Sequence, residues 1–176
     1  MAKSFYDLDY IIDISEKRLA EYTVLYQKVF ERLTNIILIY SAIGIFLIPL
    51  IQHMIAADVK GTMFYVIFAV FVILLLTSLV YFVRLLLPVD IAYLDPPKKY
   101  YESYKADLEF LNIGNHETVN DSLRGSYILD LENAIEINSR AFRKKNSYFY
   151  NALLFALLSV VPYIICLGFH LARGGK

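Results

Sequence analysis

The sequence predicts an all-α integral membrane protein with three transmembrane helices and long cytoplasmic helical extensions. Of its 176 residues, 58% are apolar, which exceeds the roughly 45–50% usual for soluble domains. The apolar residues are concentrated in three segments without Asp, Glu, Lys or Arg, at 33–57, 61–83 and 146–172. Each is longer than the roughly 20 residues with which a helix crosses the hydrocarbon core. We therefore expect transmembrane helices at 35–57, 61–86 and 147–171.

The alternative is that these segments form the core of a soluble protein. A soluble helix normally keeps one polar face. Residues 64–76 read FYVIFAVFVILLL and have no such face. The membrane interpretation is therefore favoured.

The distribution of basic residues predicts the orientation in the membrane. With three crossings, 14 of the 17 Lys and Arg residues lie on the side that holds the N-terminus and the long middle region. The other side holds Lys60, Arg173 and Lys176. Because Lys and Arg are enriched in cytoplasmic segments, we expect a cytoplasmic N-terminus and a C-terminus outside.

The segments outside the membrane are predicted to be mainly helical. Residues 1–34 form an amphipathic helix that continues into the first span with a bend at Thr34-Asn35. Residues 88–116 form a cytoplasmic linker, in which a short helix over 98–111 is capped by Gly114. Residues 117–146 form another cytoplasmic helix.

The second half of the chain is predicted to contain one long helix. Thr118 and Asp121 have the spacing of a capping box at a helix start. No glycine or proline except Gly125 interrupts the chain from there to Pro162. Residues 118–171 can therefore form one helix of about 80 Å, parallel to the N-terminal helix.

Apolar residues on the N-terminal helix form a heptad seam. They are spaced alternately four and three apart, at Leu8, Ile12, Ser15, Leu19, Tyr22, Tyr26, Val29 and Leu33. This pattern is typical of a helix that packs against another helix. The partner is either the later helix of the same chain or another copy in a homo-oligomer.

The later helix has a matching seam at Ile128, Leu131, Ile135, Asn138 and Phe142. Asn138 occupies a position where an apolar side chain is usual. A buried Asn at such a position can specify register and oligomeric state, whereas an exposed one only faces water. The candidate oligomerisation residues are Leu19, Tyr22, Tyr26, Val29, Leu33 and Asn138.

Four basic residues directly precede the third span: Arg140, Arg143, Lys144 and Lys145. Anchoring on anionic lipid explains them simply, at about 1 kcal/mol for each charge. The alternative is a binding site for an anionic signal, such as a nucleotide or a short oligonucleotide. Lys98 and Lys99 would contribute to either role, and the tyrosines at 100, 101 and 104 could stack on bases.

Small residues mark places where helices can approach closely. They are Ser41 and Gly44 in the first span, and Ala152, Ala156 and Ser159 in the third. We interpret these five residues as pore or helix contacts. Three spans cannot enclose a channel alone, so a pore requires several copies, and Pro49 and Pro162 would bend its helices.

Nothing in the sequence indicates catalysis. It has no P-loop, GxSxG, HExxH or CxxC motif. The three apolar segments at 33–57, 61–83 and 146–172 contain no charged side chain, which argues against proton relays and voltage sensors. We expect neither enzymatic activity nor a metal or cofactor.

The architecture resembles small membrane effectors of bacterial anti-phage defence systems. The stretches KRLAEYTVLYQKVFERLTNIILIYSAIGIFLIPLI and MFYVIFAVFVILLLTSLVYFVRLLL are similar to the two-transmembrane effectors of the SLATT group. The stretch NAIEINSRAFRKKNSYFYNALLF resembles the helix that enters the last span in effectors of the Hailong type. The third span departs from the two-span pattern. The resemblance lies in the architecture and transfers no site residue.

This resemblance implies an oligomeric effector that perturbs the inner membrane of a bacterium during infection. We therefore expect a homo-oligomeric channel or pore, controlled through its cytoplasmic helices. Its expected partners are other copies of itself, the lipid bilayer, an anionic signal, and a soluble protein encoded in the same operon. The alternative is a non-conducting membrane scaffold that recruits a soluble partner.

Overall fold

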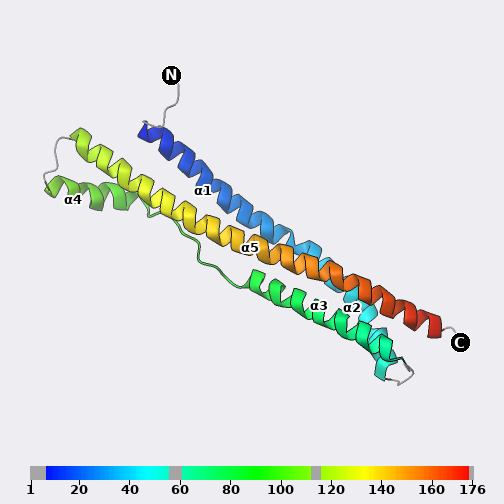
Figure 1. The fold of residues 1–176 in the computed structure, drawn as a ribbon. Helices are drawn as coiled ribbons and strands as arrows, with labels where there is room; N and C mark the ends of the chain where they lie inside the picture. The colour runs from blue at the N-terminus through cyan, green and yellow to red at the C-terminus, as the bar shows by residue number, and fades with distance from the viewer. Residues whose placement is uncertain (1–6, 56–60, 112–115, 175–176) are drawn as a thin grey trace. The chain divides into compact units, whose positions relative to one another are not determined.

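The computed structural model describes residues 7–55, 61–111 and 116–174 (Figure 1). Within these ranges all regular structure is helical. The elements are α1 (Leu8–Glu31), α2 (Leu33–Ile55), α3 (Thr62–Leu86), a π-helical segment η1 (Lys99–Tyr104), α4 (Lys105–Phe110) and α5 (His116–Gly174). Among the described residues, two helices, α3 and the His116–Phe169 part of α5, are long and apolar enough to cross a membrane.

The chain divides into two compact units. The polar unit consists of residues Met1–Gln27 and Val89–Arg143, and the apolar unit of Lys28–Pro88 and Lys144–Lys176. The long helix α5 contributes residues to both. The expectation of one uninterrupted helix over 118–171 agrees with the observed α5.

In the polar unit, α1 lies beside the first part of α5, and the two run parallel. Arg124 pairs with Asp9 at 3.5 Å, and the Tyr127 hydroxyl donates to Glu16 at 2.6 Å. Further along both helices, the rings of Tyr22 and Phe142 lie 6.3 Å apart. Residue numbers therefore rise together on the two helices, in agreement with the predicted parallel arrangement.

The apolar unit is a bundle of α2, α3 and the last part of α5. Its core joins one residue from each helix, namely Ile43, Phe71 and Tyr163. A neighbouring cluster contains Phe64 of α3 and Cys166 of α5. Since α2 and α3 are joined by a short connection, they are antiparallel.

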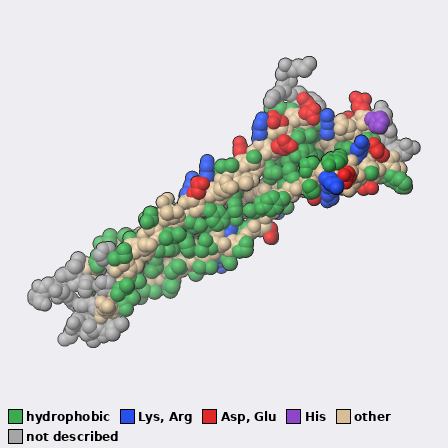
Figure 2. Space-filling view, turned by 180° about the vertical axis from the view of Figure 1, so that it is seen from behind, with side chains coloured by type: hydrophobic (Ala, Val, Ile, Leu, Met, Phe, Trp, Pro, Cys, Tyr) green, Lys and Arg blue, Asp and Glu red, His purple; other side chains and the backbone are tan. Residues whose placement is uncertain are grey.

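The two units differ in the type of side chain on their surfaces. In Figure 2 the charged side chains gather over the polar unit, whereas the visible surface of the apolar unit is largely hydrophobic. The exposed residues of α3 from Val66 to Val83 are all apolar. Such a surface suits hydrocarbon better than water.

Several helix boundaries differ from the sequence predictions. The break between α1 and α2 falls at Arg32, not at Thr34-Asn35. Thr118 lies inside the first turn of α5 and so is not its N-cap. The short helix is observed as η1 followed by α4. The predicted cap Gly114 and the side chain of Pro49 lie outside the described residues.

Pro162 is buried within α5, and the helix continues to Gly174. A proline removes one helical hydrogen bond. Helices surrounded by lipid and other helices tolerate that loss better than isolated helices in water. Pro162 therefore does not end the predicted third span.

Candidate functional site: a groove between α1 and α5

A groove of about 480 Å³ lies between α1 and α5 in the polar unit. Its lining side chains, three of them arginines, are Ile14, Ser15, Arg18, Tyr22, Glu132, Ile135, Glu136, Ser139, Arg140 and Arg143. Helical spacing explains how they meet. Residues three, four or seven apart share a face of an α-helix, as do Arg18 and Tyr22 on α1 and Glu136, Arg140 and Arg143 on α5.

The three arginines differ in whether they pair with a carboxylate. Arg140 donates to Glu136, one helical turn earlier on α5. In the part of the chain that the structure describes, neither Arg18 nor Arg143 forms an ion pair with a carboxylate. The groove therefore holds two guanidinium groups without an acidic partner.

Tyr22 lies in this field of positive charge. Its pKa is lowered from the usual value, first by a hydrogen bond with the Ser139 side chain. The charge of Arg18, a hydrogen bond with Arg18 and the charge of Arg143 lower it further, while burial opposes them. Each of these groups favours negative charge at the Tyr22 oxygen, and thus negative charge within the groove.

Lys145 is directed elsewhere. It is fully buried in the apolar unit, and its ammonium group donates to the main-chain carbonyls of Arg84, Leu85 and Leu87 at the end of α3. A cation at this position satisfies carbonyls that have no helical donor and complements the helix dipole. Lys145 thus caps α3 and does not line the groove.

The other predicted lysines also lie outside the groove lining. Lys144 is exposed. Lys98 pairs with Glu102 at 3.5 Å, and Lys99 pairs with Asp95 at 2.6 Å. Of the six basic residues predicted from the sequence, the structure brings Arg140 and Arg143 together in this groove.

Arg18, Tyr22 and Ser139 were not predicted as groove residues. The heptad spacing places Tyr22 in the α1 seam and leaves Arg18 and Ser139 outside both seams. Arg18 shares the groove with Arg140 only because α1 and α5 are parallel and aligned at these residues. The spacing of residues within each helix does not predict how the two helices align with each other.

The predicted base-stacking tyrosines mostly pack against each other. The ring of Tyr100 meets those of Tyr104 and Tyr127 edge to face, at 5.5 and 5.2 Å. The Tyr100 hydroxyl donates to Asp130 at 2.7 Å, and burial together with this carboxylate raises the pKa of Tyr100. Tyr101 is exposed.

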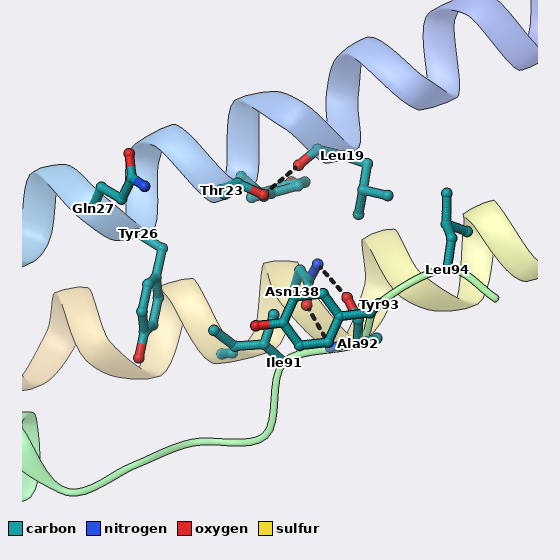
Figure 3. A pocket seen from close by; sticks show the side chains of 11 residues that line it. Leu19, Thr23, Tyr26, Gln27, Ile91, Ala92, Tyr93, Leu94 and Asn138 are labelled. Carbon is teal, nitrogen blue, oxygen red and sulfur yellow. Dashed lines mark hydrogen bonds between the residues drawn. The ribbon is translucent and has the colours of Figure 1, made fainter. Parts of the chain in front are cut away.

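A second cavity in the polar unit, of about 380 Å³, is mainly apolar. Leu19, Thr23 and Tyr26 of α1 and the segment Ile91–Leu94 line it, and Asn138 lies on α5 (Figure 3). Asn138 accepts from the Ala92 main-chain N–H at 2.9 Å and donates to the Ala92 carbonyl at 3.1 Å. Asn138 therefore fixes the segment that follows α3.

The seam residues on α1 have neighbours within the chain. Leu19, Tyr22 and Tyr26 are half-buried, and Val29 and Leu33 are buried. Tyr22 contacts Phe142 of the α5 seam. One chain therefore covers Val29 and Leu33 and partly covers the other seam residues, and a contact between copies through the seam stays a prediction.

The predicted small-residue contacts fall into two groups. Ala152, Ala156 and Ser159 are fully buried inside the apolar unit. The Ala152 carbonyl accepts from Ser78 at 2.6 Å, and the hydroxyls of Ser78 and Tyr40 are also 2.6 Å apart. Ser41 is exposed, and Gly44 is half-buried with no neighbouring heavy atom near its Cβ position.

No metal-binding cluster of His, Cys, Asp or Glu is found among the described residues. No protein-family model matches the chain, and neither a curated protein nor a solved structure is significantly similar to it.

Proposed function

We propose that the chain crosses a bacterial inner membrane three times and assembles into a homo-oligomeric channel or pore controlled by its polar unit. The two apolar helices α3 and α5 support membrane insertion. The third proposed span is α2, whose 23 residues include no Asp, Glu, Lys or Arg. With three crossings, the distribution of basic residues favours a cytoplasmic polar unit.

The main support for assembly of several copies is the exposed face of α2. Thr34, Asn35, Ser41 and Gln52 of α2 are all exposed. By contrast, the exposed residues of α3 from Val66 to Val83, and of α5 from Leu154 to Phe169, are apolar or glycine. Exposed polar side chains also occur near the ends of the other two helices, at Thr62 and Ser147. Among the described residues in the central parts of the three bundle helices, however, the one exposed polar side chain is Ser41 of α2.

Polar groups are costly in hydrocarbon and gain from helix contacts or water. Ser41 and Gln52 are eleven residues apart, which places them on one face of α2. Ile45 and Ile48 lie between them on that face, and both are exposed. A ring of α2 helices would shield the polar groups from lipid and place the isoleucines at a hydrophobic constriction.

Reconstitution tests this assembly directly. The purified chain should have the mass of an oligomer in detergent and should release ions from liposomes. Ser41→Trp should reduce the flux or change the oligomer mass, because the bulky ring prevents close approach of α2 helices. Val70→Trp on the exposed face of α3 is the matched control and should leave both unchanged. A monomeric mass without ion flux would contradict the proposal.

A role in antiviral defence rests on the architectural resemblance to small defence effectors. Such an effector should be harmless until its signal appears. We expect host cells to lose membrane potential on phage infection when the chain and its neighbouring genes are present. Loss of potential that needs no infection, or no loss at all, would argue against this role.

A non-conducting scaffold is the second candidate, and exposed apolar side chains on the polar unit favour it. Phe110 is 90% exposed and Tyr93 is 85% exposed. Large exposed apolar groups often mark protein-binding surfaces. An oligomer whose liposomes remain impermeable, and whose cellular effect is abolished by Phe110→Ser, would support the scaffold.

A further inference from the structure

We propose that the groove between α1 and α5 binds a phosphate group, held by Arg18 and Arg143. The phosphate belongs to a soluble phosphodiester or to the headgroup of an anionic lipid. This inference rests on the proposed function, since it names the ligand class that would act on the polar unit. Its test measures binding and is therefore independent of whether the oligomer conducts.

The two guanidinium groups are the first support. Arg18 comes from α1 and Arg143 from α5, and both side chains line the same groove. Neither has a carboxylate partner among the described residues. Guanidinium groups bind phosphate oxygens in a bidentate manner, and such charge-assisted hydrogen bonds are stronger than neutral ones.

Hydroxyl groups complete the set of donors. Tyr22 and Ser139 line the groove from the two opposite helices, and the Ser139 hydroxyl is the first cause of the lowered pKa of Tyr22. A hydroxyl both donates and accepts, so this pair can turn a donor towards a phosphate oxygen. The ligand would thereby connect α1 with α5 through both charged and neutral contacts.

The acidic residues limit the charge of the ligand. Glu136 is neutralised by Arg140, while Glu132 also lines the groove. Three arginines against two glutamates leave a formal charge of +1 in the lining. This balance suits the single negative charge of a phosphodiester better than the multiple charges of a polyphosphate.

Lipid anchoring by general positive charge makes a different prediction. In that case all basic residues near the membrane, Lys144 included, contribute about equally to the binding of anionic lipid. A site in the groove predicts instead that Arg143, which lines it, matters for binding, and that Lys144, which does not line it, does not matter. On α1, Arg18 should matter, whereas Lys17, which pairs with Asp13 at 2.7 Å, should not.

The full-length chain in neutral detergent should bind a dinucleoside monophosphate, used as the soluble phosphodiester probe. In nanodiscs, the lipid probe is phosphatidylglycerol, mixed with phosphatidylcholine at one part to four. Arg18→Gln and Arg143→Gln should each weaken binding at least about tenfold, as expected for a lost charge-assisted hydrogen bond. Lys17→Gln and Lys144→Gln remove the same charge at neighbouring positions and should change affinity less than about twofold.

A fifth variant separates geometry from charge. Tyr22→Phe combined with Ser139→Ala removes two hydroxyls without altering net charge, and should weaken binding about threefold to tenfold. Circular dichroism shows whether each variant folds, and the two arginine variants serve as independent tests if one does not.

The two probes identify the source of the phosphate. Binding of the soluble probe alone, or of the lipid alone, with the expected variant pattern supports the groove and assigns that source. Failure of the wild type to bind either probe overturns the proposal, as does equal weakening by all four charge variants. Specific binding by an oligomer that does not conduct would leave the groove intact and reject the channel.

Discussion

The side chain of Asn138 and the main chain of Ala92 are joined by two hydrogen bonds, of 2.9 and 3.1 Å. The amide of Asn138 presents a donor and an acceptor to the matching groups of one residue, as a neighbouring strand would. Asn138 is 7% exposed, so water cannot readily replace these bonds. The Asn in the heptad seam therefore serves the chain's own segment after α3.

We expect Asn138→Leu to reduce the stability of the polar unit by about 1–3 kcal/mol, because both polar groups of Ala92 lose their partner. Asn138→Asp should retain the acceptor but place a carboxylate oxygen against the Ala92 carbonyl. Thermal unfolding in detergent measures both changes. Asn133→Leu, at an exposed position of the same helix, is the control, and equal loss in both leucine variants would refute the assignment.

Lys145→Met should destabilise the apolar unit, also by about 1–3 kcal/mol. The methionine occupies a similar volume but leaves the buried carbonyls at the end of α3 without a donor. Lys144→Met removes the same charge from an exposed side chain and should have little effect on unfolding temperature. If the two variants unfold at the same temperature, the carbonyls do not depend on Lys145.

The contact between Tyr127 and Glu16 predicts a dependence on alkaline pH. Burial, and then the hydrogen bond to Glu16, raise the pKa of Tyr127 to about 12, against about 10 in an unfolded chain. The folded state therefore holds this proton more tightly, so the contribution to stability is complete below pH 10. It is lost as the pH rises towards 12.

Comparison with Tyr127→Phe isolates this effect from the titration of other groups. The difference in unfolding free energy between wild type and variant should be constant up to about pH 9 and should shrink between about pH 10 and 12. A difference that stays constant across this range would show that Tyr127 and Glu16 are not coupled in solution.

The sequence was sufficient to predict the elements because their signals are local. The absence of helix breakers predicted the length of α5. The alternating spacing predicted that α1 packs against another helix, and left open whether that helix is α5 or belongs to another copy. The direction of each basic side chain depends on longer-range contacts. The buried residues of α5 include six that follow one another at intervals of seven: Leu131, Asn138, Lys145, Ala152, Ser159 and Cys166.

Three of these buried heptad positions are polar, and each is satisfied by main-chain groups. Asn138 binds Ala92, Lys145 binds the end of α3, and Ser159 donates to the Ala156 carbonyl at 2.7 Å. The first two partners are more than forty residues away in the chain. Spacing could show that Lys145 faces away from Arg140 and Arg143, but it could not identify the carbonyls that Lys145 meets.

The topology prediction tests the third span independently of function. Reporter fusions at Lys60 and Lys176 should both report the outside, and a fusion at Asn115 should report the cytoplasm, because of the positive-inside distribution. A cytoplasmic signal at Lys176 would mean that the last apolar segment does not cross. A cytoplasmic signal at Lys60 would mean the same for α2.

The last prediction concerns the seam on α1. Leu19 is half-buried in the polar unit, whereas Val24 is 48% exposed. Leu19→Asp would place an unpaired carboxylate in the mainly apolar cavity that Leu19 lines together with Asn138 and Ala141 of α5, and should destabilise the polar unit by a few kcal/mol. Limited proteolysis should then cut α1 sooner, while Val24→Asp should leave the digestion pattern unchanged.

Oligomer mass measured on the same two variants distinguishes the possible partners of α1. If the seam only packs within the chain and copies meet through α2, Leu19→Asp should loosen α1 while the detergent-solubilised oligomer keeps its mass. Loss of the oligomer without faster proteolysis of α1 would show the reverse, that Leu19 contacts another copy. Loss of the oligomer in Val24→Asp alone would place the contact between copies on the exposed face of α1, and α2 would no longer be needed to explain assembly.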